Sequence, residues 1–260
     1  MRKGWMIRVM MALPPMVLIG AVAFHLGGCA SSERWAREAG QHPQQFERTI
    51  TKTVGAQFLL YVPEGVGSPG KRWPLIMFLH GSGERGKDLE RVKVNGPPKA
   101  LENQKDFPFI VVSPQLPENA AWSSDVLGAL LDEVIERLPV DTNRVYLTGL
   151  SLGGYATWDF ACDFPGRFAA IAPVCGVGDP DRACRLKPVP VWAFHGAEDP
   201  VVPLKDDEEM VNAVKACGGQ VKFTVYANTG HDAWTQAYAN PGLYAWFLEH
   251  RKNSGLPSEK

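Results

Sequence analysis

The stretch Gly149-Leu150-Ser151-Leu152-Gly153 has the pattern G-x-S-x-G and lies between two segments of regular structure. Residues 144–148 before it are apolar in the manner of a strand, and residues 154–162 after it suit a helix. A serine at such a junction is typical of a nucleophile elbow, where flanking glycines fit a turn too tight for side chains and the hydroxyl is exposed above a sheet. The alternative is a Gly/Ser-rich turn that only packs a helix onto a strand.

Strand-like and helix-like segments alternate along the rest of the chain. Residues 74–79 form a continuous apolar run, as expected of a buried central strand, and residues 123–137 place apolar side chains at helical spacing. The alternation predicts an α/β fold, with a mostly parallel central sheet and helices on both faces. Residues 174–189 are too short for a sizeable cap, so we expect an open site. The other predicted strands are 49–54 and 57–62 as a hairpin, 109–113, 145–148, 168–174, 189–195 and 221–227, and the other predicted helices are 98–103, 210–217 and 243–250.

An acid and a base follow the serine in the chain order that a nucleophile elbow requires. A serine hydroxyl is a poor nucleophile unless a neutral imidazole takes its proton and a carboxylate orients that imidazole. Asp199 and His231 each follow a predicted strand, which places them at the same edge of a parallel sheet as Ser151. We predict that these three residues are catalytic. Glu198 is the alternative acid, and a turn or helix-cap aspartate is the structural interpretation of Asp199.

Three further polar residues near these positions are interpreted as structural. His80 and His195 each end a predicted strand in a His-Gly pair, and neither follows the last strand. We expect their imidazoles to hydrogen-bond to backbone and shape loops. Asp232 adjoins His231 and is interpreted as a turn residue rather than as the triad acid.

The oxyanion of an acyl-transfer reaction needs two backbone N–H donors. One is expected from the residue after the nucleophile, which is Leu152. The other is expected from the glycine-rich loop 80–86, which follows the predicted strand 74–79. We predict Ser82 as that second donor, with Gly83 as the alternative.

Two tryptophans and an acid–base pair are candidates for the surroundings of the site. Trp122 and Trp234 lie on loops at the predicted active edge, so each is either a wall of the substrate pocket or ordinary core packing. Glu84 and Arg85 lie beside the predicted oxyanion loop. The first interpretation is an ion pair that holds the loop. The alternatives are an ion pair that shapes the pocket and an Arg85 that binds an acidic group of the substrate.

Residues 1–28 have the composition of an export signal: basic residues without an acid, an apolar run at 9–26, and small residues leading into Cys29. The end of this segment resembles a bacterial lipobox, which implies a lipidated Cys29 and a membrane-held mature chain facing the periplasm or the cell exterior. By resemblance to Gram-negative lipoproteins, Ala30-Ser31 without a retention aspartate favours the outer membrane. The alternatives are simple secretion and an uncleaved anchor helix, but Pro14-Pro15 interrupts the run and the run is short for a membrane span.

Composition limits the remaining possibilities. The 260 residues are 45% hydrophobic and 21% charged, which suits one α/β catalytic domain. The formal net charge is −1 and there is no basic block, so nucleic acid is not expected as a partner. We predict a signal peptide at 1–28, a polar tether at 29–45, the catalytic domain at 46–252 and a tail at 253–260.

The cysteines of the exported part are free to form disulfides in an oxidising compartment. Cys175 and Cys184 lie nine residues apart around a Gly/Pro/Asp loop, so we predict that they pair. Cys217 at a predicted helix end is then expected to be a buried free thiol. The cysteine spacings fit no zinc pattern, and neither a metal nor a cofactor is expected.

The motifs quoted above, together with Trp192-Ala193-Phe194-His195-Gly196 and Gly230-His231-Asp232-Ala233-Trp234, resemble the α/β-hydrolase superfamily. More narrowly, they are similar to the bacterial phospholipase/carboxylesterase-like group, which borders on enzymes like dienelactone hydrolase, feruloyl esterase and polyhydroxybutyrate depolymerase. The resemblance covers about residues 57–250. It implies the α/β-hydrolase fold and ester hydrolysis without a cofactor. The serine nucleophile departs from the cysteine of dienelactone hydrolases, which argues against that particular activity.

The function expected from these features is an exported, lipid-anchored serine esterase that forms an acyl-enzyme. Because no lid or large acyl-binding insertion is visible, short-chain or aryl esters are expected. Feruloyl or acetyl groups on polysaccharide are a hypothesis that rests only on the expected location at the cell surface. The alternatives are a serine peptidase on the same triad and a non-catalytic surface binding protein. The sequence leaves the oligomeric state open.

Overall fold

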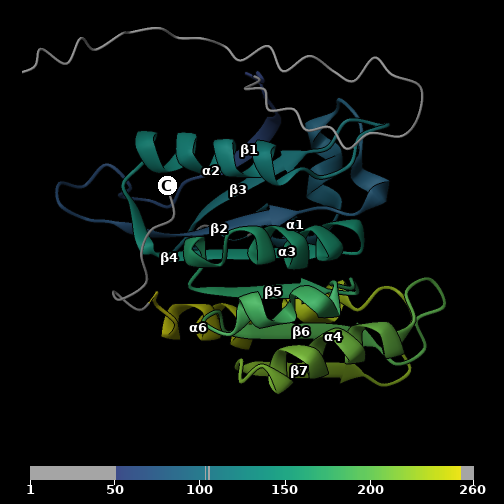
Figure 1. Cartoon of the computed structure of the whole chain (residues 1–260). Coiled ribbons are helices and arrows are strands. Elements are labelled where there is room, and N and C mark those ends of the chain that lie inside the picture. Colours follow the sequence, from purple (N-terminus) through teal and green to yellow (C-terminus); the bar gives the residue numbers. More distant parts are fainter. Residues whose placement is uncertain (1–50, 103, 105, 253–260) are drawn as a thin grey trace, which may run out of the picture. The chain divides into compact units, whose positions relative to one another are not determined.

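A seven-stranded sheet forms the centre of the computed structural model, which describes residues 51–102, 104 and 106–252 (Figure 1). The strand order is β1-β3-β2-β4-β5-β6-β7, in which β1 is antiparallel to β3 and the other neighbouring strands are parallel. The strands are β1 (Gln57–Tyr61), β2 (Trp73–Leu79), β3 (Ile110–Gln115), β4 (Val140–Leu150), β5 (Ala170–Val174), β6 (Val191–Gly196) and β7 (Val221–Tyr226).

Four of the five inner strands are buried along their whole length. Every residue of β2, β3, β5 and β6 is buried, whereas the edge strands β1 and β7 keep partly exposed positions. A parallel strand covered on both faces has no solvent side, so it can be apolar at successive positions. The continuous apolar runs in the sequence therefore correspond to the middle of the sheet.

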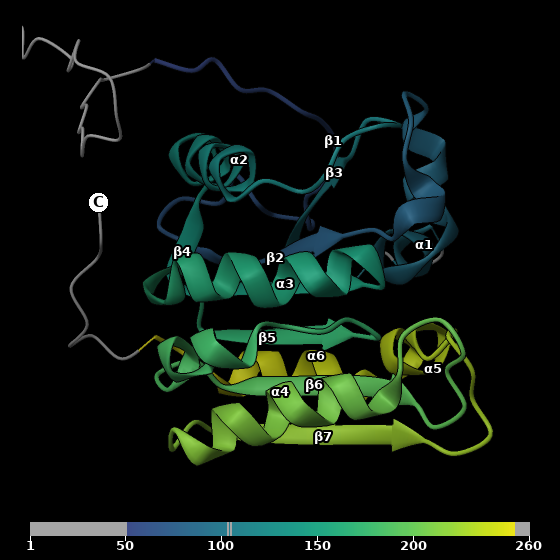
Figure 2. The same cartoon turned by 45° about the vertical axis from the view of Figure 1, so that its right-hand side comes forward.

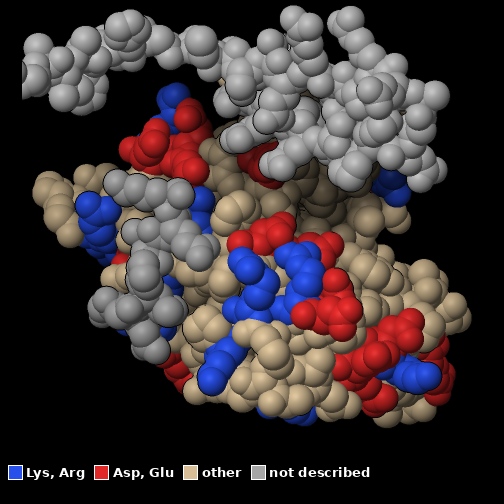
Figure 3. Space-filling model, viewed as in Figure 1, with Lys and Arg blue, Asp and Glu red and all other residues tan. Residues whose placement is uncertain are grey.

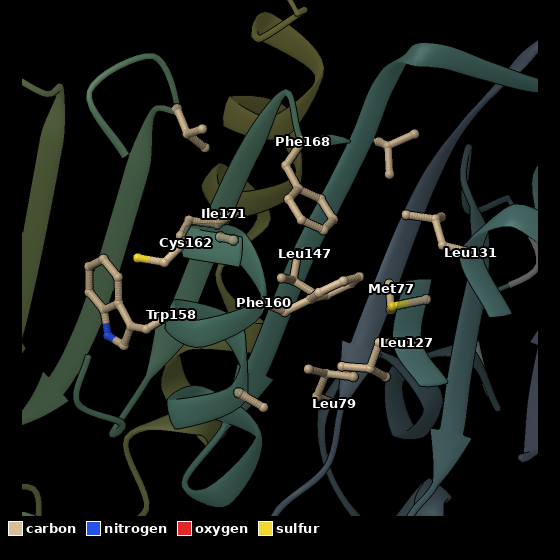
Figure 4. Packing of buried hydrophobic residues seen from close by; sticks show 14 of the residues in the cluster. Met77, Leu79, Leu127, Leu131, Leu147, Trp158, Phe160, Cys162, Phe168 and Ile171 are labelled. Carbon is tan, nitrogen blue, oxygen red and sulfur yellow. The ribbon is translucent and has the colours of Figure 1, made fainter. Parts of the chain in front are cut away.

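Helices cover both faces of this sheet. On one face, α2, α3 and α4 lie side by side, and α5 and α6 lie on the other (Figure 2). Figure 4 shows the first layer, where Leu127 and Leu131 of α2 and Phe160 of α3 meet Met77 and Leu147 of the sheet. The helices are α1 (Gly96–Leu101), α2 (Ser124–Arg137), α3 (Leu152–Asp163), α4 (Leu204–Ala216), α5 (Trp234–Ala239) and α6 (Pro241–Glu249). This architecture confirms the predicted fold class.

The predicted hairpin at 49–54 and 57–62 is wrong for the part that the structure describes. Residues 51–56 form no strand and are largely exposed, and β1 pairs instead with β3, with Gln57 opposite Gln115. β3 carries buried residues on an otherwise open edge, so its backbone groups need the partner strand that β1 supplies. Residues 51–56 have no comparable apolar face to bury.

The predicted disulfide is also wrong, because Cys184 pairs with Cys217 rather than with Cys175. Cys184 lies in the 3₁₀ helix Pro180–Leu186 and Cys217 ends α4, and these elements pack together with a Cα–Cα separation of 5.1 Å. That separation is in the normal range for a disulfide. Cys175 is instead buried as a free thiol, as is Cys162.

The predicted signal peptide, Cys29 and the tether fall within residues 1–50, outside the described residues, as does the predicted tail 253–260. In the part that is described, none of the helices combines the length and apolarity needed to cross a bilayer. Figure 3 shows acidic and basic side chains interspersed over the visible face rather than gathered into one basic surface.

Candidate active site

Ser151 sits at a sharp turn between β4 and α3. Its φ and ψ are 51° and −117°, a conformation that non-glycine residues rarely adopt. The flanking glycines are sterically required, because a Cβ on Gly149 would lie 2.3 Å from the carbonyl oxygen of Gly153, and one on Gly153 would lie 2.0 Å from that of Leu79. The strained serine and its two glycines therefore have the geometry of a nucleophile elbow.

The structure brings the predicted acid and base together with this serine. His231 Nε2 lies 2.9 Å from Ser151 Oγ, and His231 Nδ1 lies 2.7 Å from Asp199 Oδ2. With Asp199 ionised, His231 carries its proton on Nδ1 and presents the Nε2 lone pair to the serine hydroxyl. The three side chains can thus pass a proton between the serine and the imidazole.

Asp199 is held as a buried carboxylate. Its side chain is fully buried, and Oδ1 accepts hydrogen bonds from the backbone N–H groups of Val201 at 2.8 Å and Val202 at 2.9 Å. Burial alone would raise the pKa of Asp199, but the hydrogen bonds from His231, Val202 and Val201 lower it below its usual value. The alternative acid, Glu198, is exposed and does not contact His231.

Glycines also bring the loops of the acid and the base into contact. A Cβ on Gly196, at the end of β6, would lie 2.0 Å from the carbonyl oxygen of Gly230. The Glu198 N–H donates to the Thr229 carbonyl at 2.9 Å. This close backbone approach sets the separation between Asp199 and His231.

The two predicted oxyanion donors follow β4 and β2, which are neighbours in the sheet. Leu152 begins α3, so its N–H lacks an intrahelical acceptor. Ser82 begins the 3₁₀ helix Ser82–Glu84, and Gly81 before it approaches Leu150 so closely that a Cβ would lie 2.8 Å from its Cδ1. The geometry places both backbone segments near Ser151, and the donor roles of Leu152, Ser82 and Gly83 stay predictions.

Glu84 and Arg85 do not pair with each other. The buried Glu84 carboxylate accepts a hydrogen bond from Asn95 Nδ2 at 2.6 Å, and its other oxygen lies 3.9 Å from His80 Nδ1. Arg85 donates to the carbonyl oxygens of Ser82 and Glu118, both at 3.3 Å. Each side chain thus holds the oxyanion loop separately, and the interpretation as a mutual ion pair is wrong.

His80 is a loop-shaping residue, as predicted. Its Nε2 accepts from the Leu116 N–H at 2.9 Å, so the ring proton is on Nδ1, which donates to the Gly81 carbonyl at 2.6 Å. Burial lowers the pKa of His80. Asp232 is likewise a turn residue that accepts hydrogen bonds from Thr235.

The two predicted pocket tryptophans lie on opposite sides of the serine. Trp234 meets the His231 ring edge to face at 5.1 Å, and Trp122 meets the His80 ring at 5.0 Å. Trp122 also lines a groove of about 150 Å³ together with Leu152. Trp234 therefore contacts the predicted base, His231, and Trp122 lies beside a predicted oxyanion donor.

Asp207, which lies near the triad, was missed by sequence reasoning, whereas His195 was predicted as a residue that hydrogen-bonds to backbone. Asp207 in α4 is fully buried, and its Oδ2 lies 2.8 Å from Nδ1 of the equally buried His195. His195 Nε2 lies 3.0 Å from the Val202 carbonyl oxygen and 3.4 Å from Asp199 Oδ2. Asp207 occupies an acidic run, Asp206-Asp207-Glu208-Glu209, which reads as a solvated helix face. Its position on the apolar side of α4, between Pro203 and Met210, was the available signal.

Cys175, Asp199 and His231 offer ligand atoms within 4.8 Å of one another. Burial raises the pKa of the Cys175 thiol to about 12, so the thiol stays protonated at neutral pH. Asp199 and His231 already satisfy each other. The donor set fits a hydrogen-bonded triad better than a metal site, because a metal would need the thiolate.

Comparison with known proteins agrees with this fold. Residues 117–242 match the model of the Dienelactone hydrolase family. The solved structure of a thermostable esterase superposes with a TM-score of 0.65 and 32% identity, covering 75% of this chain and 59% of that chain. The chain has the α/β-hydrolase fold.

Two curated relatives have similar sequences. This chain is 30% identical over 180 residues to feruloyl esterase C of Emericella nidulans, covering 65% of this chain. It is 26% identical over 270 residues to a poly(3-hydroxyoctanoate) depolymerase of Pseudomonas fluorescens, covering 90% of this chain and 95% of the relative. The match spans 64% of the length of the feruloyl esterase, a little under two thirds.

Proposed function

We propose that this α/β-hydrolase is an exported serine esterase that works through Ser151, His231 and Asp199. The observation that carries the proposal is the continuous hydrogen-bonded line from Oγ of the strained Ser151 through His231 to the buried Asp199. A metal is not required, since the three side chains supply nucleophile, base and orienting charge.

The reaction follows from the proton positions. Ser151 Oγ attacks the ester carbonyl carbon while His231 Nε2 takes the hydroxyl proton, and the N–H groups of Leu152 and Ser82 bind the oxyanion. The imidazolium, stabilised by Asp199, then gives that proton to the leaving alcohol, and an acyl-enzyme remains. A water molecule, deprotonated by His231, releases the acid and restores Ser151.

Acyl esters of short-chain or aryl acids are the proposed substrates, including acids esterified to polysaccharide. The names of the relatives, a feruloyl esterase and a polyester depolymerase, support this class. Between β5 and β6 the described chain inserts only the 3₁₀ helix Pro180–Leu186, so this connection adds no roof over Ser151. An uncapped site suits an ester that stays attached to a polymer.

The test compares an ester and the matching amide of one acyl group, with the wild type and Ser151→Ala. We expect hydrolysis of the ester, at least a hundredfold slower hydrolysis of the amide, and loss of both activities in the variant. Covalent labelling of Ser151 by a fluorophosphonate probe is expected in the folded wild type. Preference for the amide would favour a peptidase, and absence of labelling would favour a binding protein.

Export and lipid anchoring are proposed from residues 1–29, on the observation that small residues lead into Cys29 after an apolar run. The full chain expressed in a Gram-negative host should incorporate radiolabelled palmitate and sediment with the outer membrane. The Cys29→Ser variant should incorporate none. If the wild type carried no label and stayed in the soluble periplasmic fraction, the lipid anchor would be contradicted, but export would still be supported.

A further inference from the structure

A groove leads away from the nucleophile along the first two turns of α3. One wall is α3 itself, with Leu152, Tyr155 and Asp159, and the other is the loop before α2, with Trp122. The groove has a volume of about 150 Å³, and its apolar lining includes the buried Leu127 and Phe160. Leu152 at one end directly follows Ser151, so this end of the groove is next to the nucleophile in the chain.

The sheet order shows which half of an ester this groove would hold. The loop that carries Trp122 follows β3, on one side of β4, whereas Asp199 and His231 follow β6 and β7, on the other side. The leaving alcohol must lie next to His231 Nε2, which protonates it. The acyl group therefore extends to the side away from His231, which is where the groove lies.

The groove's length and lining indicate the kind of acyl group. Asp159 follows Leu152 by seven residues, which is about 10 Å along a helix axis. Trp122 and the exposed Tyr155 offer aromatic surface on the way, and Leu127 and Phe160 offer apolar surface. Asp159 is a carboxylate at the far end, and its link to Arg182 is loose, at 3.5 Å.

We propose that the groove binds the acyl half of the ester, and that it fits a flat aryl acid whose distal end bears a hydroxyl that donates to Asp159. This inference rests on the proposed esterase function. It adds an acyl-specificity role for Tyr155 and Asp159, which sequence reasoning did not single out. An aliphatic acyl group would use the apolar lining and leave Asp159 without a role.

The test uses methyl esters of 4-hydroxycinnamate, cinnamate and butyrate, so that only the acyl group varies. We expect kcat/KM for the hydroxylated ester to exceed that for cinnamate about tenfold, which corresponds to 1.4 kcal/mol. Asp159→Asn should bring this ratio close to one. Glu136→Gln, an exposed acid on α2 outside the groove, is the matched control.

Three results would overturn the inference: butyrate preferred over both aryl esters, an unchanged ratio in Asp159→Asn, or an equal change in Glu136→Gln. Calorimetry measures the binding of free 4-hydroxycinnamate to Ser151→Ala and to the double variant that also carries Asp159→Asn. This measurement separates the inference from the esterase proposal. If no ester is hydrolysed but Asp159-dependent binding is seen, the groove assignment holds and the esterase proposal fails.

A second inference comes from the buried pair behind the triad acid. His195 Nε2 faces two acceptors, the Val202 carbonyl oxygen at 3.0 Å and Asp199 Oδ2 at 3.4 Å, so this nitrogen carries a proton. Nδ1 faces Asp207 Oδ2 at 2.8 Å, so a second proton lies between these two atoms. Asp207 and His195 are fully buried, and together they form a neutral pair whose Nε2–H donates to the Val202 carbonyl and lies beside Asp199.

We infer that His195 and Asp207 are positioning residues for the triad. Nε2 of His195 donates to the Val202 carbonyl and lies 3.4 Å from Oδ2 of Asp199, the same oxygen that binds His231, so it restricts where that oxygen can lie. Asp207 orients His195 much as Asp199 orients His231. The arrangement extends the line Ser151–His231–Asp199 by a second histidine–aspartate unit.

Two substitutions of His195 separate positioning from packing. Glutamine can place an N–H near the position of Nε2, whereas asparagine reaches only the position of Nδ1. We expect His195→Asn to lower kcat about tenfold with KM changed less than twofold, and His195→Gln to recover most of the loss at similar melting temperature. Equal kcat in the two variants, or losses that follow melting temperature alone, would overturn the inference.

A measurement on the unmodified protein covers the case in which the variants do not fold. With ¹⁵N-labelled histidine, the His195 ring is expected to show a slowly exchanging Nε2–H at neutral pH, because that proton is buried. Fluorophosphonate labelling of Ser151 reports whether the sample is active. An unprotonated Nε2 on His195 would remove the donor and with it the inference.

Discussion

The two sides of Ser151 are built in different ways. On the β6–β7 side, Asp199 is fully buried, and three N–H groups, those of His231, Val201 and Val202, donate to it. On the β2–β3 side, Ser82 and Gly83 are exposed, and arginines hold the loop through its carbonyl oxygens. The first side is fixed by hydrogen bonds to a buried carboxylate, whereas the second is held at an exposed loop. Changes to the first should therefore slow every ester, and changes to the second should alter which ester is preferred.

The largest effect is expected at the residue that both sides share. Ser151→Ala should lower kcat by about 10⁵-fold or more with every ester, because removal of the nucleophile in other serine hydrolases has that scale of effect. Steady-state assays across the ester panel measure it, with circular dichroism as the control for folding. A residual rate above one hundredth of wild type would place the nucleophile elsewhere.

The next effect tests the buried side. Asp199→Asn should lower kcat about 10⁴-fold, since an amide in place of the carboxylate favours the wrong imidazole tautomer. The loss should be the same factor for aryl and alkyl esters. Glu198→Gln is the matched control on the neighbouring exposed acid and should stay within twofold of wild type. A greater loss in Glu198→Gln would identify that residue as the acid.

Variants of the disulfide test whether the β6–β7 side of Ser151 can be destabilised without a change in its predicted catalytic residues. Cys217→Ser should lower the free energy of unfolding by about 3 to 4 kcal/mol, because the bridge closes a long loop in the unfolded chain. Urea unfolding measures the loss, and Cys184→Ser should match it. Near-wild-type kcat is expected in both variants under native conditions. If Cys217→Ser left the free energy of unfolding unchanged, the result would favour the Cys175–Cys184 pairing predicted from the sequence.

The smallest effect concerns the exposed side. Glu84→Gln keeps the acceptor for Asn95 but removes the charge beside His80, so the oxyanion loop should loosen. We expect a loss in kcat/KM of about tenfold or less, 1.4 kcal/mol at most, which differs among esters. Glu90→Gln, an exposed acid in the same region, should have no effect. A uniform loss as large as that of Asp199→Asn would erase the contrast between the two sides.

Local patterns predicted the parts of the site that depend on chain order. Ser151, Asp199 and His231 each follow a strand, and parallel strands end at one edge, so their proximity was expected before any distance was known. The apolar run at 74–79 likewise marked a buried strand. These features can be predicted from the sequence because each depends on residues a few positions apart.

Features that join distant segments were not predicted. Nine residues separate Cys175 from Cys184 and thirty-three separate Cys184 from Cys217, yet the longer loop is the one that closes. The partner of β1 and the burial of Asp207 depend in the same way on which elements pack together. Nothing near Asp207 distinguishes it from the solvated acids beside it except its place on the inner face of α4.

The amino-acid sequence by itself determined the α/β fold, the turn at Ser151 and the choice of Asp199 and His231 as the predicted acid and base, because periodicity, glycine sterics and chain order are local properties. Only the tertiary structure decided which cysteines pair, which side of Ser151 holds the groove, and that a second histidine–aspartate unit lies behind Asp199. Those outcomes depend on distances between segments far apart in the chain, which close packing sets and no short stretch of sequence contains.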